Sequence, residues 1–255
     1  MEYRFVGNTG VKVSQFAYGT MSFGGDADEK TSAELFNTCR DFGINFFDCA
    51  NMYQQGKAEE ILGKLITHCR DEVIISSKVY FNMGSDVNAS GASRRHIMQQ
   101  AEASLHRLNT DHIDFYFIHR FDDRTDLEQT LRALDDLVRQ GKILYPMASN
   151  FAAWQVSKAL GISAIQGLAK FCGIQPMYNL VKRQAEVELL PMAASENLAV
   201  FPYSPLGAGV LTGKYLRNTA KEGARLNTNK IYKTRYGDPM VDGTVEKFLS
   251  YAEDH

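Results

Sequence analysis

The sequence predicts an α/β fold, a parallel (β/α)8 TIM-type barrel preceded by a small β-hairpin. Short apolar segments alternate along the chain with longer segments of helical periodicity. Three successive apolar segments lead to Asp48, Lys78 and His119. Because the C-terminal ends of all barrel strands surround one mouth, where enzymes of this fold place their catalytic groups, the pattern predicts an enzyme built at that mouth.

The first elements are two short strands, Tyr3–Phe5 and Val11–Val13, joined by a turn through Gly7–Gly10. Candidate barrel strands follow, each short, apolar and followed by a helix-like segment. They are Gln15–Tyr18, Ile44–Phe47, Val73–Ser77, Ile113–Ile118, Ile143–Met147, Cys172–Gln175 and Ala199–Pro202. Pro146 lies inside the fifth and cannot donate to a ladder, so we expect a bulge there or a position whose N–H is unpaired.

Helical segments separate these strands and carry start and stop signals. Asp28 and Ser93 each precede an amphipathic run, as N-cap residues do. A further apolar stripe from Leu127 to Val138 ends before Gly141, where glycine suits a left-handed cap. The stripes are interpreted as core. No low-complexity linker divides the chain, so residues 1–255 are predicted to form a single domain.

Composition narrows the class of protein. A chain of 255 residues with 44% apolar content can bury one substantial core. A net charge of −2 with dispersed Lys and Arg argues against a nucleic-acid partner. No apolar run approaches the roughly 18 residues of a membrane span, and the N-terminus lacks the apolar core of a signal peptide. We therefore expect no membrane partner and a cytoplasmic location.

The cysteines and histidines give no metal signal. Cys39, Cys49, Cys69 and Cys172 have no metal-ligand spacing, and a chain of this size does not need disulfides. The six histidines contain no HExxH pattern. We predict free, mostly buried thiols and no metal site, with Cys49 interpreted as a packed small side chain beside Asp48.

The segment from Gly43 to Gly63 places a carboxylate, Asp48, and a phenol, Tyr53, at one strand-to-loop junction. This segment resembles the aldo-keto reductase signature, and the resemblance extends over essentially the whole chain. Supporting residues occur in family order: Gly19-Thr20-Met21, Lys78, His119, Ser149-Asn150, Gln175 and Tyr203 to Gly209. Within the family, the chain looks most like bacterial reductases related to the β subunits of voltage-gated potassium channels.

The four strand-end residues Asp48, Tyr53, Lys78 and His119 suit carbonyl reduction. Hydride transfer builds negative charge on the carbonyl oxygen, and this charge must be neutralised by a proton or stabilised by positioned hydrogen-bond donors. A free tyrosine, with a pKa of about 10, is a sluggish acid. We expect Lys78 to lower the pKa of Tyr53 and Asp48 to keep Lys78 charged and aimed. Tyr53 is then the proton donor, and His119 holds the substrate carbonyl.

Each of these residues has an alternative interpretation when taken alone. Asp48 can cap a turn, Tyr53 can be a rim aromatic, and Lys78 can be a solvated charge. A lone histidine such as His119 is more often structural than catalytic. Their joint occurrence at the same end of consecutive strands favours the catalytic set, because independent structural residues have no reason to converge there.

The resemblance implies a nicotinamide cofactor, NADPH more often than NADH. No Gly-x-Gly-x-x-Gly follows the first strand, so a Rossmann site is disfavoured. The resemblance gives nicotinamide stacking to Tyr203 and amide recognition to Ser149, Asn150 and Gln175. The glycine loop can approach a pyrophosphate closely, with Lys214 and Arg225 adding charge. The expected cofactor-binding residues are Gly19, Thr20, Met21, Asp48, Ser149, Asn150, Gln175, Tyr203, Ser204, Pro205, Leu206, Gly207, Gly209, Lys214 and Arg225.

The expected substrate is a small aldehyde or ketone, because the candidate wall residues are mainly apolar or aromatic. They are Met21, Phe23, Tyr80 and Arg120, with Trp154 as a further candidate. A homo-oligomer is compatible with the resemblance, since monomers, dimers and larger rings occur among relatives.

The chain departs from the family pattern at its C-terminus. Relatives continue beyond the point equivalent to His255 with an eighth strand, an eighth helix and contacts to the 2′-phosphate of the cofactor. We expect a C-terminally incomplete barrel, with Val245–Glu253 as a helix. The NADPH preference is therefore inherited from the resemblance alone.

Three functions remain open. The first is an NAD(P)H-dependent carbonyl reductase. The second is a nucleotide-binding regulatory subunit with little turnover, against which His119 argues because the channel subunits tend to lack histidine there. The third is an inactive family member.

Overall fold

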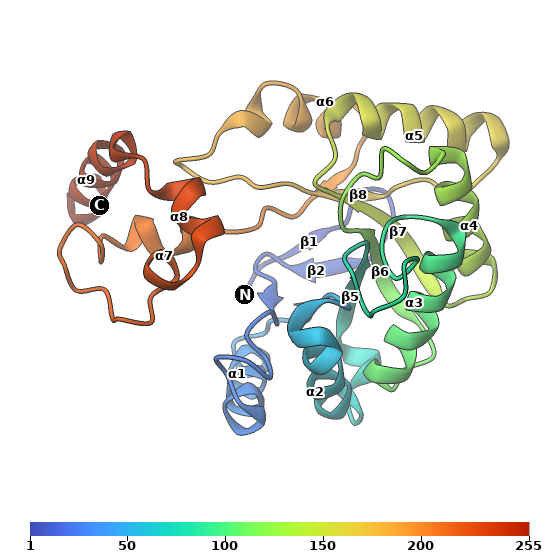
Figure 1. Ribbon diagram of the computed structural model, residues 1–255, viewed down its shortest axis with the longest axis horizontal. Coiled ribbons are helices and arrows are strands. Elements are labelled where there is room, and N and C mark those ends of the chain that lie inside the picture. The colour runs from blue at the N-terminus through green and yellow to red at the C-terminus, as the bar shows by residue number, and fades with distance from the viewer. Residues whose placement is uncertain (255) are drawn as a thin grey trace. The chain divides into compact units, whose positions relative to one another are not determined.

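A computed structural model describes residues 1–254 (Figure 1). The chain forms two compact units. The first comprises Met1–Ile174 and Met192–Val200, and the second comprises Gln175–Pro191 and the chain from Phe201 onward. This division does not test the prediction that residues 1–255 form one domain, which stays a prediction.

The first unit begins with the expected hairpin. Strands β1 (Tyr3–Phe5) and β2 (Lys12–Ser14) pair antiparallel, with Tyr3 opposite Ser14. Gly7 and Gly10 in the connecting turn have φ of 49° and 77°. Such left-handed conformations favour glycine, so the turn residues determine where the chain reverses.

A parallel sheet of seven strands follows, ordered along the chain as β3 to β9. Its strands are β3 (Tyr18–Gly19), β4 (Phe46–Asp48), β5 (Ile74–Val79), β6 (Ile113–Ile118), β7 (Ile143–Ser149), β8 (Gly173–Gln175) and β9 (Ala199–Val200). Figure 1 shows helices between successive strands of this curled sheet. The arrangement is consistent with a (β/α)8 TIM-type fold, so the predicted fold class is confirmed.

The expected strand ranges are corrected at their edges. The first was predicted over Gln15–Tyr18, but β3 contains only Tyr18–Gly19, because the Gln15 amide instead donates to the Glu2 carbonyl. No bulge occurs at Pro146, since the register between β6 and β7 runs through it unbroken. The Pro146 carbonyl accepts a hydrogen bond from the Cys172 amide. The ring nitrogen of Pro146, which has no hydrogen to donate, therefore faces the segment that contains Cys172.

The helices of this unit are α1 (Glu29–Asp41), α2 (Lys57–Ile66), α3 (Arg94–Leu108), α4 (Leu127–Arg139) and α5 (Ala153–Gln166). Asp28 and Ser93 cap α1 and α3 by accepting from the backbone amides of Thr31 and His96, as expected. Gly141 follows α4 with φ of 71°, confirming the left-handed residue predicted at its end.

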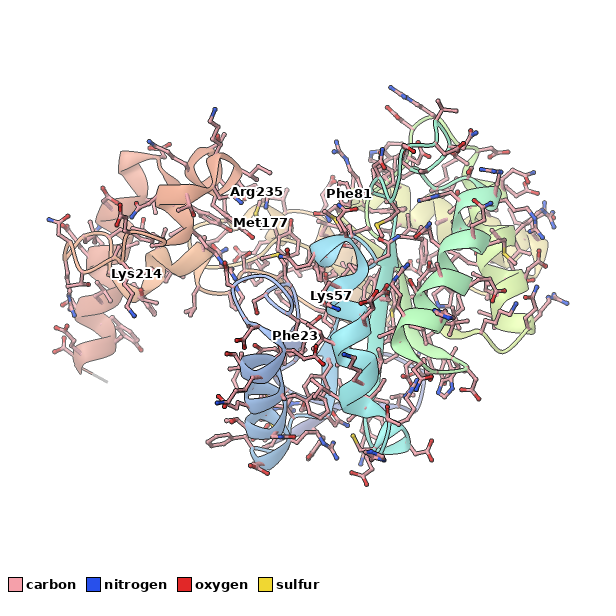
Figure 2. The ribbon with its side chains drawn as sticks, turned by 60° about the horizontal axis from the view of Figure 1, so that its bottom comes forward. Phe23, Lys57, Phe81, Met177, Lys214 and Arg235 are labelled. Atoms are coloured by element: carbon pink, nitrogen blue, oxygen red, sulfur yellow. The ribbon has the colours of Figure 1, made fainter. Side chains whose placement is uncertain are left out.

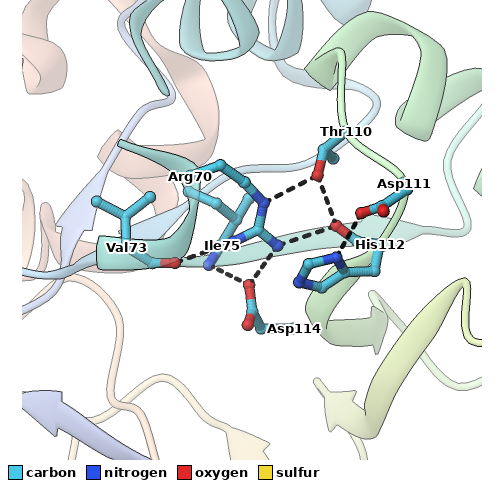
Figure 3. Close-up of polar contacts among 7 residues, drawn as sticks. All are labelled: Arg70, Val73, Ile75, Thr110, Asp111, His112 and Asp114. Atoms are coloured by element: carbon cyan, nitrogen blue, oxygen red, sulfur yellow. Dashed lines mark hydrogen bonds and ion pairs between the residues drawn. The ribbon is translucent and has the colours of Figure 1, made fainter. Parts of the chain in front are cut away.

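A polar network joins the N-terminal ends of β5 and β6 (Figure 3). The Arg70 guanidinium donates to the Asp114 carboxylate at 2.8 Å, to Thr110 Oγ1 at 2.9 Å and to the carbonyls of Val73 and His112 at 3.0 Å. Asp114 Oδ2 also accepts from the Ile75 amide at 2.9 Å. This network satisfies a nearly buried carboxylate at the end of β5 remote from Lys78.

The second unit has its own small core. It contains the 3-10 turns η3 (Gln184–Glu186) and η4 (Gly207–Thr212) and the helices α7 (Arg225–Thr228), α8 (Lys230–Tyr236) and α9 (Pro239–Asp254). The last confirms the helix predicted over Val245–Glu253. Val210, Tyr236 and Val245 are among the buried residues that pack together. Helix α6 (Leu189–Ser195) lies where the two units divide along the chain.

None of the helices formed by residues 1–254 combines the length and apolar character needed to cross a membrane. Of the four cysteines, Cys39 and Cys49 are buried, while Cys69 and Cys172 are half-buried. The thiols are free, and burial is confirmed for two of them.

Candidate active site

Three of the four predicted catalytic residues lie at strand ends in the first unit. Asp48 is the last residue of β4, Lys78 is the last but one of β5, and His119 directly follows β6. The register places Asp48 beside Ser76 and Lys78 beside Phe117. Parallel pairing without a bulge therefore aligns the C-terminal ends of three adjacent strands and presents their side chains together.

The ammonium of Lys78 is the fixed charge of the site. Lys78 is fully buried, and its Nζ donates to Asp48 Oδ2 at 2.6 Å and to the Cys49 carbonyl at 2.7 Å. Burial by itself lowers the pKa of Lys78, but the charge of Asp48 and its hydrogen bond to Nζ act in the opposite direction, and the pKa lies above its ordinary value. Lys78 therefore stays protonated at neutral pH.

The Asp48 carboxylate is oriented from two sides. Its Oδ1 accepts from Ser76 Oγ at 2.6 Å, which leaves Oδ2 for Lys78. Thr20, fully buried, donates from its amide at 2.9 Å and from Oγ1 at 3.1 Å to the Asp48 carbonyl. These contacts fix the residue's backbone as well as its carboxylate. Ser76 was missed by the sequence analysis, although a hydroxyl two positions before Lys78 on the same strand face was the available signal.

Tyr53 lies in the 3-10 turn η1 (Tyr53–Gly56), with its ring centroid 5.2 Å from Lys78 Nζ. Burial raises the pKa of Tyr53 to about 12, while the nearby Lys78 lowers it. The expected effect of Lys78 is therefore present, but the prediction that the pKa falls is wrong, because desolvation of the phenolate is the larger effect. The phenol keeps its proton throughout the neutral range.

His119 faces both Tyr53 and an aromatic side chain. Its ring centroid lies 6.1 Å from that of Tyr53 and 4.9 Å from that of Phe81, both nearly edge-on. Burial, together with the charge of Lys78, holds the pKa of His119 well below 6.5. The imidazole is therefore neutral at pH 7. Its buried Nδ1 has no hydrogen-bond partner among residues 1–254.

Two of the predicted cofactor residues adjoin His119. Ser149 ends β7 and is almost fully buried, and Asn150 follows it in a left-handed conformation with φ of 56°. Asn150 Nδ2 donates to the His119 carbonyl at 2.9 Å and to Ser149 Oγ at 3.0 Å. The strained backbone of Asn150 is the kind of feature that concentrates at functional sites.

The glycine loop lies in the second unit and contains several left-handed residues in succession. Ser204, Gly207, Ala208 and Gly209 have φ of 56°, 55°, 57° and 89°. A Cβ on Gly209 would meet Lys214 Nζ at 2.6 Å, so the cation packs where this residue has no side chain. Lys214 is labelled in Figure 2. A cation held against a glycine-rich loop fits a phosphate group.

Other predicted cofactor residues of this unit have defined places. The Tyr203 amide donates to the Pro176 carbonyl at 3.1 Å, and the Arg225 guanidinium lies over the Tyr232 ring at 5.7 Å. Asn179, which sequence analysis missed, is buried and donates to the Ser204 carbonyl at 2.9 Å and to the Tyr236 hydroxyl at 3.1 Å. Asn179 thereby supports the left-handed start of the loop. Of the rest, Gln175 is buried, and Pro205 and Leu206 are exposed.

The candidate substrate residues are only partly brought together. Phe23 is fully buried and packs against Tyr18 with ring centroids 5.7 Å apart, so it belongs to the core and not to an accessible wall. Met21 and Tyr80 are half-buried, while Gly19, Arg120 and Trp154 are exposed. Phe81, missed by the sequence analysis, is the aromatic residue that contacts His119. Its place two residues beyond β5 follows from the turn and has no sequence signal.

This arrangement joins a protonated phenol, a neutral imidazole and a fixed ammonium. The phenol can donate a proton, the imidazole can hydrogen-bond a carbonyl oxygen, and the ammonium stabilises the phenolate that remains. These are the requirements of proton-assisted reduction at a carbonyl.

Comparison with known proteins agrees with this chemistry. The family model described as the Aldo/keto reductase family matches residues 15–254. A probable voltage-gated potassium channel subunit beta from Oryza sativa subsp. japonica is 36% identical over 252 residues, covering 97% of this chain and 76% of that protein. The uncharacterized oxidoreductase YrpG of Bacillus subtilis is 38% identical, covering 93% and 78%. The aldo-keto reductase YhdN of the same organism is 33% identical, covering 98% and 81%.

Proposed function

Because the chain belongs to the aldo/keto reductase family, we propose that it is an NADPH-dependent reductase of small aldehydes or ketones, with Tyr53 as the proton donor. One observation carries the proposal: the buried Lys78–Asp48 ion pair lies beside Tyr53, whose ring in turn faces the buried His119. Oxidoreductase activity follows from the family. The cofactor, the carbonyl substrate and the residue roles are the parts proposed.

Tyr53 holds the proton that the reaction consumes. A pKa of about 12 keeps the phenol protonated until negative charge develops on the substrate oxygen. The alkoxide oxygen of the reduced substrate is a stronger base than the Tyr53 phenolate, so the proton moves from Tyr53 Oη to that oxygen. Lys78 then stabilises the phenolate left behind, and Asp48 keeps Lys78 in place. His119, neutral and buried, donates a hydrogen bond to the same substrate oxygen from a ring nitrogen.

The cofactor proposed here is a nicotinamide nucleotide, which would supply the hydride when bound. We assign recognition of the carboxamide to Ser149, Asn150 and Gln175, and stacking on the ring to Tyr203. The loop containing Gly207 and Gly209, with Lys214 and Arg225, is assigned to the pyrophosphate. NADPH is proposed ahead of NADH on the family resemblance, together with a cytoplasmic location and a homo-oligomeric state.

A second function is favoured by the similarity to potassium channel β subunits. It is binding of the nucleotide as a regulatory signal, with little turnover. The catalytic set would then sense the cofactor's redox state in place of processing external substrate. His119 favours the first function, since a neutral imidazole whose ring faces Tyr53 can hydrogen-bond the substrate oxygen that Tyr53 protonates.

The test is turnover by the purified protein with NADPH, and with NADH in parallel, against a panel of small aldehydes and ketones. Loss of reduced-nicotinamide absorbance that depends on both protein and carbonyl supports the reductase. Tyr53→Phe is the control, expected to lower kcat by about 10²- to 10⁴-fold with unchanged nucleotide affinity. Tight NADPH binding without turnover on any carbonyl favours the regulatory function instead.

A further inference from the structure

We propose that the carboxylate of Glu59 is a positioning residue that holds the segment carrying Tyr53 and the strand carrying Lys78 in fixed relation. The inference rests on the proposed function, because it concerns the same catalytic pair. Glu59 itself lies on α2, on the helix side of β5, and touches neither Tyr53 nor Lys78 through any of its hydrogen bonds within residues 1–254.

Both carboxylate oxygens of Glu59 are engaged. The residue is fully buried, and its Oε1 accepts from Ser77 Oγ at 2.5 Å. Its Oε2 accepts from Arg107 Nε at 2.7 Å, on α3. Arg107 Nη2 also reaches Ser104 Oγ at 3.3 Å. One carboxylate thus connects α2, α3 and β5 through two directed hydrogen bonds.

The contact with Ser77 acts on the strand that carries Lys78. Side chains alternate between the two faces of a strand, so Ser76 and Lys78 share one face and Ser77 lies on the other. Ser76 and Lys78 both bind the Asp48 carboxylate. Ser77, between them, is held from the opposite face by Glu59. The strand is therefore fixed from both sides at the catalytic lysine.

The contact with Arg107 acts on the turn that carries Tyr53. Gln54, Gln55 and Gly56 follow Tyr53 with φ of 48°, 54° and 93°, a left-handed run that costs free energy for the two non-glycine residues. A Cβ on Gly56 would lie 2.8 Å from Arg107 Cδ. The Arg107 side chain, held by Glu59, therefore packs directly against the end of this strained turn.

Burying a carboxylate in the core costs free energy of desolvation, which its hydrogen-bond and ion-pair partners must offset. Apolar side chains fill other buried positions of the same helix, at Ile61, Leu62 and Ile66. What a carboxylate adds is direction: it fixes the two groups it binds at set distances and angles. The two groups here belong to the supports of Lys78 and Tyr53, whose mutual placement determines proton transfer.

The Arg70–Asp114 pair provides a matched control (Figure 3). It is comparably buried, with side-chain exposure of 16% and 9% against 18% and 0% for Arg107 and Glu59. It binds the same strand through the Ile75 amide, three residues before Lys78, and makes no contact with the turn that carries Tyr53 through the hydrogen bonds it forms within residues 1–254. The change in kcat in Asp114→Asn therefore measures the general effect of losing a buried ion pair. The change in kcat in Glu59→Gln measures that effect together with any effect of losing the positioning of Tyr53 and Lys78.

The experiment compares the wild type, Glu59→Gln, Asp114→Asn, Ser77→Ala and Ser77→Thr. We expect Glu59→Gln to lower kcat by about 10- to 100-fold, with KM and nucleotide affinity changed by no more than about twofold. Asp114→Asn should keep kcat within about twofold of wild type. Ser77→Ala should lower kcat in the direction of Glu59→Gln, and Ser77→Thr, which keeps the hydroxyl, should restore it.

A second measurement does not depend on turnover. The Gln55 amide donates to the Met52 carbonyl, and the Lys57 amide donates to the carbonyls of Tyr53 and Gln54. Hydrogen exchange at these amides should be about tenfold or more faster in Glu59→Gln than in wild type, and unchanged in Asp114→Asn. If the wild type reduces no carbonyl, the proposed function fails, and exchange alone decides the positioning role.

Three results overturn the inference. The first is amide hydrogen exchange across residues 53–57 of Glu59→Gln at the wild-type rate. The second is a wild-type kcat in Glu59→Gln when the wild type is active, and the third is a fall in kcat in Asp114→Asn equal to that in Glu59→Gln. Each means that Glu59 contributes to packing without setting the geometry of Tyr53 and Lys78.

Discussion

Lys78 and Asp48 form an ion pair in which the ammonium is wholly buried, with 2.6 Å between Nζ and Oδ2. The pair joins the parallel strands β4 and β5 near their C-terminal ends. It contributes to stability as well as to the proposed chemistry, because either charge buried without the other would raise the free energy of the folded state. The first prediction separates the two roles.

Lys78→Met should abolish turnover and lower the free energy of unfolding by about 3 kcal/mol, since Asp48 loses its cationic partner while remaining largely buried. Adding Asp48→Asn removes the negative charge that Lys78 no longer balances, so the double variant should regain part of that stability without regaining activity. Urea unfolding and steady-state kinetics measure the two effects. A double variant no more stable than Lys78→Met would contradict a paired buried charge.

The high pKa of Tyr53 predicts the pH dependence of reduction. The reaction needs the protonated phenol, and activity is lost only as pH rises through its pKa, which is about 12. The kcat/KM of reduction should therefore show no falling limb attributable to Tyr53 below about pH 10, because kcat/KM reports the pKa values of the enzyme before the carbonyl binds. The pH profile of kcat/KM at low carbonyl concentration measures it. A falling limb between pH 7 and 8 would indicate that Lys78 outweighs burial, contrary to the structure.

His119 should make the protein less stable in weak acid. Its folded-state pKa lies well below the 6.5 of the unfolded chain, so the unfolded state binds more protons as pH falls below that value. The free energy of unfolding is therefore lost as pH falls through about 6.5, by up to about 1.4 kcal/mol per pH unit for this one group. His119→Asn should flatten the dependence measured by urea unfolding between about pH 5 and 7.5.

His96 supplies the comparison for that measurement. Burial lowers the pKa of His96 as well, so it contributes to the same slope. His96→Asn should flatten the slope without reducing turnover, whereas His119→Asn should do both. A slope in His119→Asn identical to the wild-type slope would mean that folding does not lower the pKa of His119.

Gly209→Ala should weaken nucleotide binding more than it destabilises the fold. The added Cβ meets the flexible end of Lys214 at 2.6 Å, so the cation moves away from the loop. We expect the Kd for NADPH to rise by about tenfold, as for loss of one charged hydrogen bond. Gly141→Ala is the control, because Gly141 has a similarly positive φ of 71° but open space around its Cβ position. Equal Kd values for NADPH in the two variants would mean that Lys214 does not contribute to nucleotide binding by the loop.

Local sequence signals were sufficient for much of the fold. The β6 strand was predicted with its exact bounds at Ile113–Ile118, because a continuous apolar run is buried on both faces of a parallel sheet. The caps Asp28 and Ser93 were found because capping uses only neighbouring residues. The first strand was misplaced, since the Gln15 amide bonds to Glu2, a contact that no local pattern records.

The sequence by itself determined the order of the elements, the residues Asp48, Lys78 and His119 at adjacent strand ends, and Tyr53 in the loop after the first of these strands, because strand alternation and spacing are properties of the local chain. Only the tertiary structure decided how strongly each group is desolvated, and so that Tyr53 keeps its proton and His119 is neutral. It also decided that Phe23 is core, that Phe81 contacts His119, and that Glu59 supports the catalytic pair from behind. Burial and contacts between distant segments depend on packing, which no spacing within one segment encodes.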